Sequence, residues 1–283
     1  TKFIITSHGF SDFWKHESYY DMWHKMADKR ITWAIPKHKK EIKLPPNNYI
    51  YFKNKRKYHK YLTYVTARQL FFPEELTQLT IDGRNQQSVQ EFDLNNMKKF
   101  NTILNKKIFK DLIFLPHKKL KNRQINSSIK SSIKEVHLDN NIYEWGNTSE
   151  IKNILKKNYV QKYNSPLMEY LYKSKIVVCA YPETALYESI LTGPTILLFN
   201  YNSVVDDRYR EIFKKLSKYK IAFSNPEDAA LHINNVWDNV DEWWHSKDVK
   251  NTLDEFVQQT ASISKNPAKS WVEFLKEEIS LIN

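Results

Sequence analysis

Short runs of apolar residues recur along the chain, and most of them are rich in β-branched and aromatic side chains. They stand at 3–6, 31–35, 61–66, 112–116, 136–138, 175–180, 195–199 and 220–224. Several are apolar throughout and do not alternate with polar residues, which is typical of strands covered on both faces of a sheet. We therefore predict a strand at each of these runs.

Segments with the helical spacing of apolar residues separate many of the predicted strands. Such segments are 92–106, 164–174, 207–219 and 225–240. Four residues of the first fall on one helical stripe: Leu94, Met97, Phe100 and Leu104. In the last, Asn225 is a good N-cap and Pro226 takes the first helical position. Strands that alternate with helices predict right-handed βαβ units and an α/β fold with a parallel sheet.

The predicted elements are unevenly distributed along the chain. Residues 58–240 hold six candidate strands, enough for one complete Rossmann-like, doubly wound domain. Residues 1–57 hold too few elements for a domain, and 241–283 read as helices. We expect 1–57 to close an acceptor-side Rossmann-like domain, whose remainder lies upstream of residue 1, and 241–283 to pack back across the domains.

Length and composition exclude several classes of protein. No run of about 18 apolar residues occurs in the 283 residues, so no transmembrane helix is predicted. The first ten residues, TKFIITSHGF, lack the layout of a signal peptide. The single cysteine, Cys179, has no partner within the chain for a disulfide. These features predict a reducing, cytoplasmic location.

The chain is strongly basic, with a formal net charge of +12 that is concentrated in 37–60 and 98–134. Such segments are often a solvated lysine-rich surface, and they also suit a phosphate-rich ligand, an anionic membrane surface or nucleic acid. Aromatic residues stand beside the lysines, as in proteins that bind single strands. Since no nucleic-acid recognition motif accompanies them, we do not expect nucleic acid as a partner. Peripheral contact with the inner face of the membrane stays open.

The segment 179–199 carries the first candidate site, because ligands of open parallel sheets sit beyond the carboxyl ends of the strands. A turn with Pro182 and Glu183 leads into a helix that Thr184 can cap, and the free N–H groups of its first turn favour a phosphate. Glu188, one turn further, can accept hydrogen bonds from ribose hydroxyls. An ordinary strand–turn–helix with a surface glutamate is the alternative. Gly193 is expected to end the helix in a left-handed conformation, before Pro194.

Three further segments place polar residues directly after predicted strands. His117, Lys118 and Lys119 can bind the departing phosphate of a nucleotide donor, or form an ordinary basic loop. His8 can act as a general base toward an acceptor hydroxyl, or be structural. Arg68 can reach a phosphate or a sugar.

Several common chemistries lack their motifs in this sequence. There is no GxGxxG, no GxxxxGK[ST], no HExxH, no CxxC and no GxSxG. A nicotinamide, a flavin, a P-loop and a structural zinc are therefore not expected. What remains is a phosphate-bearing ligand held by a helix N-terminus and a basic loop.

The segment SKIVVCAYPETALYESILTGPTILLF (174–199) resembles the donor-site segment of a family of bacterial surface-carbohydrate and O-antigen transferases, which typically reads aDlvvcDYPgTaflEslamnvPTilfw. SHGF (7–10) stands where the family has QHGG, and ADKRITWAIP (27–36) stands where it has aDkfltWGw. The resemblance covers most of the chain and is tightest over 174–245. More distantly, PHKK (116–119) is similar to motifs of bacterial sialyltransferases, Kdo transferases and teichoic-acid polymerases.

The resemblance implies a two-domain GT-B architecture and a metal-independent glycosyltransferase of surface-polysaccharide or lipopolysaccharide synthesis. It implies a CMP- or CDP-linked sugar as donor, a glycan or glycolipid as acceptor, and no other cofactor. Thr184 and Glu188 would contact the donor nucleotide, His117 would lie near its phosphate, and His8 would face the acceptor.

Departures from the family pattern leave the transferred sugar open. Ala180 replaces an acidic residue, Glu183 replaces a glycine, Phe10 replaces the second glycine of His-Gly-Gly, and Lys118 stands where a proline is usual. Two alternative functions also stay open. One is a CDP-polyol phosphotransferase on the same fold, and the other is a non-enzymatic basic protein that binds anionic lipid or nucleic acid.

Overall fold

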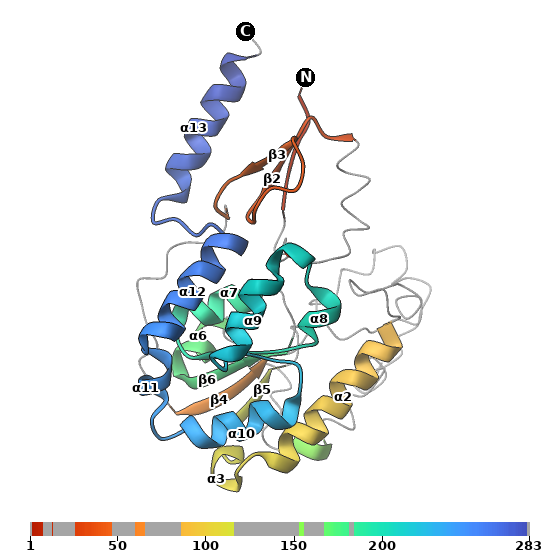
Figure 1. The fold of residues 1–283 in the computed structure, drawn as a ribbon, viewed down its shortest axis with the longest axis vertical. Helices are drawn as coiled ribbons and strands as arrows, with labels where there is room; N and C mark the ends of the chain where they lie inside the picture. The colour runs from red at the N-terminus through yellow and green to blue at the C-terminus, as the bar shows by residue number, and fades with distance from the viewer. Residues whose placement is uncertain are drawn as a thin grey trace, which may run out of the picture.

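The computed structural model describes residues 2–7, 13, 26–46, 60–65, 86–115, 153–155, 167–180 and 184–281. These residues form an α/β structure with two parallel sheets, a larger one and a smaller one (Figure 1). The predicted strand at 136–138 lies outside the described residues.

The larger sheet has five parallel strands: β4 (Tyr61–Val65), β5 (Leu112–Leu115), β6 (Ser174–Cys179), β7 (Thr195–Leu198) and β8 (Ala222–Phe223). Their spatial order is β5-β4-β6-β7-β8. The order therefore reverses direction between β4 and β6, as in doubly wound Rossmann-like folds. The prediction of a doubly wound parallel sheet is confirmed, and each of these five strands lies within one residue or two of its predicted run.

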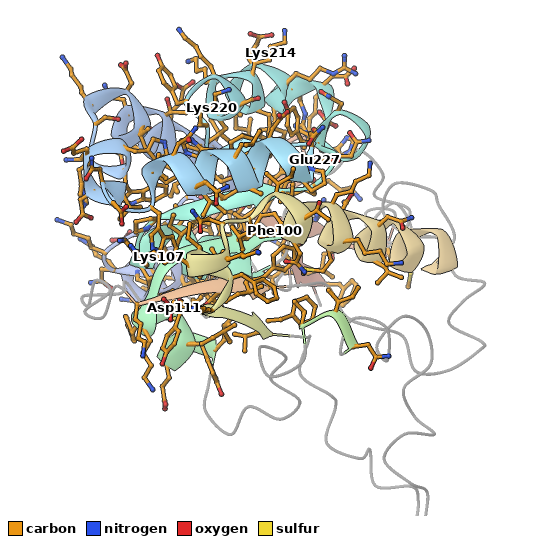
Figure 2. The ribbon with its side chains drawn as sticks, turned by 90° about the horizontal axis from the view of Figure 1, so that it is seen from below. Phe100, Lys107, Asp111, Lys214, Lys220 and Glu227 are labelled. Carbon is orange, nitrogen blue, oxygen red and sulfur yellow. The ribbon has the colours of Figure 1, made fainter. Side chains whose placement is uncertain are left out.

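Helices cover both faces of the larger sheet (Figure 1). On one face lie α2 (Gln86–Ile103), α3 (Lys106–Phe109) and α10 (Pro226–Val236), and α2 and α10 run side by side (Figure 2). The other face carries α6 (Leu167–Lys173), α7 (Thr184–Thr192), α9 (Arg210–Lys218), α11 (Val240–Trp244) and α12 (Lys247–Thr260). Along β6, Ile176 and Val178 face the first layer, whereas Val177 and Cys179 face the second. Burial on both faces explains why these strands are apolar throughout.

The predicted helical details are largely confirmed. All four residues of the stripe on α2 are buried: Leu94, Met97, Phe100 and Leu104. The helix begins earlier than expected and ends at Ile103, and Asn105 then caps the separate helix α3 by accepting from the Lys107 N–H at 2.9 Å. At the start of α10, Asn225 Oδ1 accepts from the N–H groups of Glu227 and Asp228 at 2.8 and 3.1 Å. The predicted cap therefore stabilises α10 as expected.

The smaller sheet has three parallel strands, β1 (Ile4–Thr6), β2 (Lys29–Thr32) and β3 (Glu41–Lys43), in that order. Two details correct the prediction. The strand expected at 31–35 is Lys29–Thr32, because Trp33 and Ala34 leave the sheet and are buried in the core beneath α9 and α12. The short, polar strand β3 was not predicted; it pairs with β2 where Arg30 and Glu41 form a buried ion pair of 2.8 Å.

Helix α13 (Pro267–Ser280) packs on the smaller sheet (Figure 1). Phe274 contacts the cluster of Ile31 and Leu44, and the Trp271 indole N–H donates to the Pro45 carbonyl at 2.8 Å. Glu278 pairs with Lys2 at 3.3 Å and with Lys29. The last helix is thus held to the first strands of the chain. None of the described helices is both long and apolar enough to cross a membrane.

The segment that follows β2 joins the two sheets. The Ile35 N–H donates to the Gln259 carbonyl at 3.1 Å, and the Ser262 hydroxyl donates to the Trp33 carbonyl at 2.8 Å. Arg208, in the short helix η3 (Asp207–Tyr209) that follows β7, donates to the Ile35 carbonyl at 3.2 Å. The carboxyl end of β2 therefore faces elements beyond the carboxyl end of β7.

Candidate functional site

The strands of the larger sheet end level with one another. Leu115 of β5 pairs with Val65 of β4, which pairs with Cys179 of β6, which pairs with Leu197 of β7. The Ala180 N–H also donates to the Val65 carbonyl at 2.9 Å. The segments after these strands consequently start on one edge of the sheet, and the point where the strand order reverses lies between β4 and β6.

Most of the predicted site residues belong to those segments. His8, Arg68, His117, Lys118, Lys119, Pro182 and Glu183 lie outside the described residues. In the sequence, Arg68 comes three residues after β4, and His117 comes two residues after β5. Thr184 and Glu188 are described, and their surroundings give the site its geometry.

Helix α7 begins at Thr184, as the sequence predicts, four residues after Ala180. Leu186 and Ile190 bury one side of the helix in the core, and Tyr187 stacks on Phe256 of α12 with ring centroids 6.2 Å apart. The Tyr187 hydroxyl also donates to the Thr260 carbonyl at 3.3 Å. These contacts hold the positive end of the helix dipole at the carboxyl edge of the sheet, where it favours an anion.

A small polar cluster joins β6 to α7. The buried thiol of Cys179 donates to Ser189 Oγ at 3.4 Å and contacts the Ala185 carbonyl at 3.8 Å. Ser189 Oγ itself donates to the Ala185 carbonyl at 2.6 Å. Sequence reasoning missed Ser189, although its place four residues after Ala185 is the spacing of one helical turn. The cluster positions the helix; a buried thiol of this kind is not a nucleophile.

Among the described residues, Glu188 is the best candidate for a direct contact with a ligand. It lies on α7 four residues after Thr184, so both side chains are on the same helical face. Burial raises the pKa of its carboxyl from 4.5 to about 7. The structure records no hydrogen bond or ion pair between this carboxyl and any described residue. A half-buried carboxyl that ionises near neutral pH can accept hydrogen bonds from ligand hydroxyls, and such groups cluster at functional sites.

The end of α7 differs from the prediction. Gly193 has a φ of 159°, which is close to extended and far from the left-handed value of about 57°. Its N–H donates to the Ser189 carbonyl at 3.1 Å, and Pro194 then leads into β7. The helix therefore ends without the left-handed cap that the sequence suggests, because the chain must straighten at once into a strand.

Metal ligands do not gather in the described part of the chain. Among those residues, no group of three or more His, Cys, Asp or Glu side chains could hold a metal ion. The described edge of the sheet presents a helix N-terminus and a carboxyl.

A doubly wound parallel sheet, with a helix starting at the point where the strand order reverses, defines a Rossmann-like α/β protein. Proteins of this class bind their ligands at that edge of the sheet. Comparison with family models identifies it more closely: the model described as "LIC12162 family transferase" matches residues 1–275. The chain belongs to this transferase family. A comparison with curated proteins finds no match. The family match confirms the prediction of a transferase.

Proposed function

We propose that the protein is a metal-independent glycosyltransferase of the GT-B type. It moves a sugar from a cytidine-nucleotide donor to a surface-polysaccharide or lipopolysaccharide acceptor. The observation that carries the proposal is the placement of α7: its N-terminus lies at the reversal of strand order, and Glu188 stands one turn in. The transferase family of the chain supports the reaction class.

The donor nucleotide lies against the start of α7. Its phosphate accepts hydrogen bonds from the N–H groups of the first turn, at the positive end of the helix dipole. Glu188, on the same helical face as Thr184, accepts hydrogen bonds from the ribose hydroxyls. A carboxyl with a pKa of about 7 is sufficiently ionised at neutral pH to do so.

The basic segment after β5 neutralises the donor phosphate. The ends of β5 and β6 are separated only by β4, so they lie on the order of 10 Å apart. His117 follows Leu115 by two residues, and two residues of extended chain span about 7 Å. His117, Lys118 and Lys119 are thus within reach of a phosphate at α7, and Arg68 has the same reach from β4.

The reaction needs positioning and charge stabilisation. The acceptor hydroxyl attacks the anomeric carbon, the bond from that carbon to the donor phosphate oxygen breaks, and His8 takes the hydroxyl proton. The helix N-terminus and the basic segment stabilise the charge on the departing nucleotide. The lysine-rich segments hold the enzyme at the inner face of the membrane when the acceptor is a glycolipid.

Isothermal titration with CMP and CDP tests the donor site. We expect the wild-type chain to bind at least one of them, and Glu188→Ala and His117→Ala each to weaken binding about tenfold. Glu273→Ala is the matched control, because Glu273 is exposed on α13. Absence of binding by the wild type, or equal binding by all variants, contradicts the assignment. Product analysis with a labelled donor separates glycosyl transfer from transfer of a polyol phosphate, since only the latter moves phosphorus to the acceptor.

A further inference from the structure

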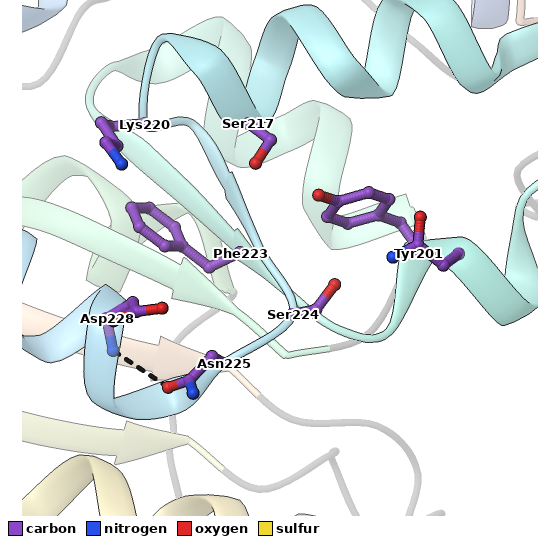
Figure 3. Close-up of a pocket in the computed structure, with 8 residues that line it drawn as sticks. Tyr201, Ser217, Lys220, Phe223, Ser224, Asn225 and Asp228 are labelled. Atoms are coloured by element: carbon purple, nitrogen blue, oxygen red, sulfur yellow. Dashed lines mark hydrogen bonds between the residues drawn. The ribbon is translucent and has the colours of Figure 1, made fainter.

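A pocket of about 230 Å³ lies along the outer edge of β8, the last strand of the larger sheet (Figure 3). Its walls come from the end of α9, the start of α8 (Tyr201–Val204) and the first turn of α10. None of the residues that line the pocket belongs to α7 or to the turn before it. The pocket is therefore distinct from the site at α7, and its residues are spread over 201–228.

Polar side chains from three elements converge on this pocket. Figure 3 shows the Lys220 amine, the Ser217 hydroxyl and the Tyr201 hydroxyl directed toward one space, with the Asp228 carboxyl on the opposite side. The Phe223 ring lies between Lys220 and Asp228 and forms an apolar part of the wall. The pocket wall thus combines hydrogen-bond donors and acceptors with a small apolar surface.

These polar groups lack partners within the described residues. Ser224 Oγ is shielded from solvent and has no hydrogen-bond partner. Lys220 and Asp228 are exposed, and the structure records no ion pair or side-chain hydrogen bond between the Lys220 amine or the Asp228 carboxyl and a described residue, so both groups are open to a ligand. Buried polar atoms in folded proteins are nearly always paired, so an unpaired one at a pocket wall points to a bound molecule.

The backbone of Lys220 adds an independent observation. Its φ of 62° lies in the left-handed region, at the position after α9 where glycine is usual. The Lys220 N–H donates to the Ser217 carbonyl at 3.0 Å, and the Ile221 N–H donates to the Leu216 carbonyl at 2.8 Å, which fixes this conformation. A lysine is disfavoured in this backbone conformation. Its amine points into the pocket, where it can donate hydrogen bonds to a ligand.

The charges around the pocket disfavour an anionic ligand. The first-turn N–H groups of α10 are occupied, because Asn225 Oδ1 accepts from both Glu227 and Asp228 and Pro226 has none. The Asp228 carboxyl adds negative charge at the pocket, whereas the Glu227 carboxyl is not part of the lining and pairs with Lys99 at 3.6 Å. A phosphate would therefore find one ammonium group and no free helix N-terminus. A neutral ligand with several hydroxyls fits better, since each hydroxyl both donates and accepts.

The volume of the pocket limits the size of the ligand. Pockets for drug-sized ligands are roughly 300–1,000 Å³, so about 230 Å³ suits a single ring and not a nucleotide. We propose that this pocket binds one neutral sugar residue of a glycan. Its hydroxyls donate to the Asp228 carboxyl and accept from the Lys220 ammonium, and its apolar C–H groups face Phe223. The proposal does not depend on a nucleotide at α7.

Ligand-observed saturation-transfer NMR tests the pocket with the full chain. The probes are the methyl glycosides of glucose, galactose, mannose, N-acetylglucosamine and N-acetylgalactosamine. We expect saturation transfer to at least one of them, reduced at least fivefold in Lys220→Gly and in Asp228→Asn. Lys214→Ala is the control for charge, because Lys214 is exposed on α9 and pairs with Glu211 at 2.6 Å. It leaves the signal unchanged.

The variant Lys220→Gly separates binding from folding. Glycine adopts a φ of 62° without strain, so the melting temperature stays equal to that of the wild type or rises while sugar binding is lost. Absence of saturation transfer to every glycoside in the wild type overturns the proposal, as does equal transfer in Lys220→Gly and Asp228→Asn. If Glu188→Gln loses the signal and the two pocket variants do not, the sugar lies at α7, and this result also overturns the proposal. If the chain binds a glycoside but neither CMP nor CDP, the sugar pocket is supported and the proposed donor site is contradicted.

Discussion

Glu188 shows how the environment of one residue couples stability to pH. Its carboxyl has a pKa of about 7 in the folded chain and about 4.5 when unfolded, because burial on α7 disfavours the charged form. The folded state therefore binds this proton more tightly than the unfolded state. The free energy of unfolding consequently falls as the pH rises from about 4.5 through 7.

Replacing Glu188 by glutamine removes this penalty. We expect Glu188→Gln to raise the free energy of unfolding at pH 8 by on the order of 2 kcal/mol, and to change it little at pH 4.5, where the carboxyl is mostly protonated in the folded state. Urea denaturation of both proteins at the two pH values measures the difference. An equal change at both pH values would mean that packing, and not ionisation, is responsible. A gain in stability together with weaker nucleotide binding is the pattern expected of a functional residue.

His232 on α10 is the second residue with a large shift. Burial, and to a smaller extent the charge of Lys220, lowers the pKa of its imidazole from 6.5 to about 4. Its ring lies 5.6 Å from Phe223 and 4.7 Å from Trp243 between centroids. His232 is thus neutral at physiological pH, and its contribution to stability is lost as the pH falls from about 6.5 toward 4.

At the scale of elements, a buried ion pair joins β2 to β3 beside the pairing of their backbones. Arg30 and Glu41 are register partners, and their side chains are 2% and 1% exposed. Glu41 also accepts from the N–H groups of Lys37 and His38, so the same carboxylate orders the turn before β3. Loss of either partner leaves a buried charge without its counterion.

We expect Arg30→Met to lower the free energy of unfolding by roughly 3–5 kcal/mol, because the Glu41 carboxylate stays buried without its partner. The exposed pair of Lys214 and Glu211 on α9 is the matched comparison, and Lys214→Ala should cost about 1 kcal/mol or less. Chemical denaturation measures both variants. Similar costs for the two pairs would contradict the role of burial.

At the scale of the whole molecule, the segment after β2 links the smaller sheet to the core of the larger one. Trp33 and Ala34 follow β2, yet they are packed among residues of α7, α9 and α12. The hydrogen bond from Ser262 to the Trp33 carbonyl closes the junction from the C-terminal side. Because these contacts are buried, the sheets should unfold together.

Trp33→Ala tests this junction. The indole is 1% exposed, and a truncation of this kind costs roughly 3–5 kcal/mol from lost burial and the cavity left behind. We expect a single unfolding transition in the wild type, with circular dichroism and tryptophan fluorescence coincident, and a lower midpoint in the variant. Two separate transitions in the wild type would show that the sheets unfold independently.

The sequence predicted the larger sheet well because its strands are buried on both faces. The runs at β6 and β7 are apolar throughout, and the cap at Asn225 acts on residues two and three positions away. The same reasoning missed β3, since its polar residue Glu41 is held in the sheet by a partner on another strand, Arg30 of β2. It also extended β2 to residue 35, since Trp33 and Ala34 look like strand residues and are buried elsewhere.

The candidate site, too, was predicted from the sequence only in part. The sequence placed polar residues directly after four strands and the start of α7 at Thr184, and the structure confirms the helix start. The high pKa of Glu188 could not be predicted, because it depends on how much of α7 the rest of the fold buries. Nor could the pocket at β8, whose polar groups come from separate elements and have no motif.

The amino-acid sequence by itself determined the strands of the larger sheet and most of the helices around it, because periodicity and capping act between residues a few positions apart. It also determined the parallel, doubly wound class of the sheet, through the alternation of those elements. Only the tertiary structure decided the ion pair of Arg30 with Glu41, the position of Trp33 against Ser262, 229 residues away, and the ionisation of Glu188. Burial and distance set these properties, and both depend on residues that the chain brings together only when it folds.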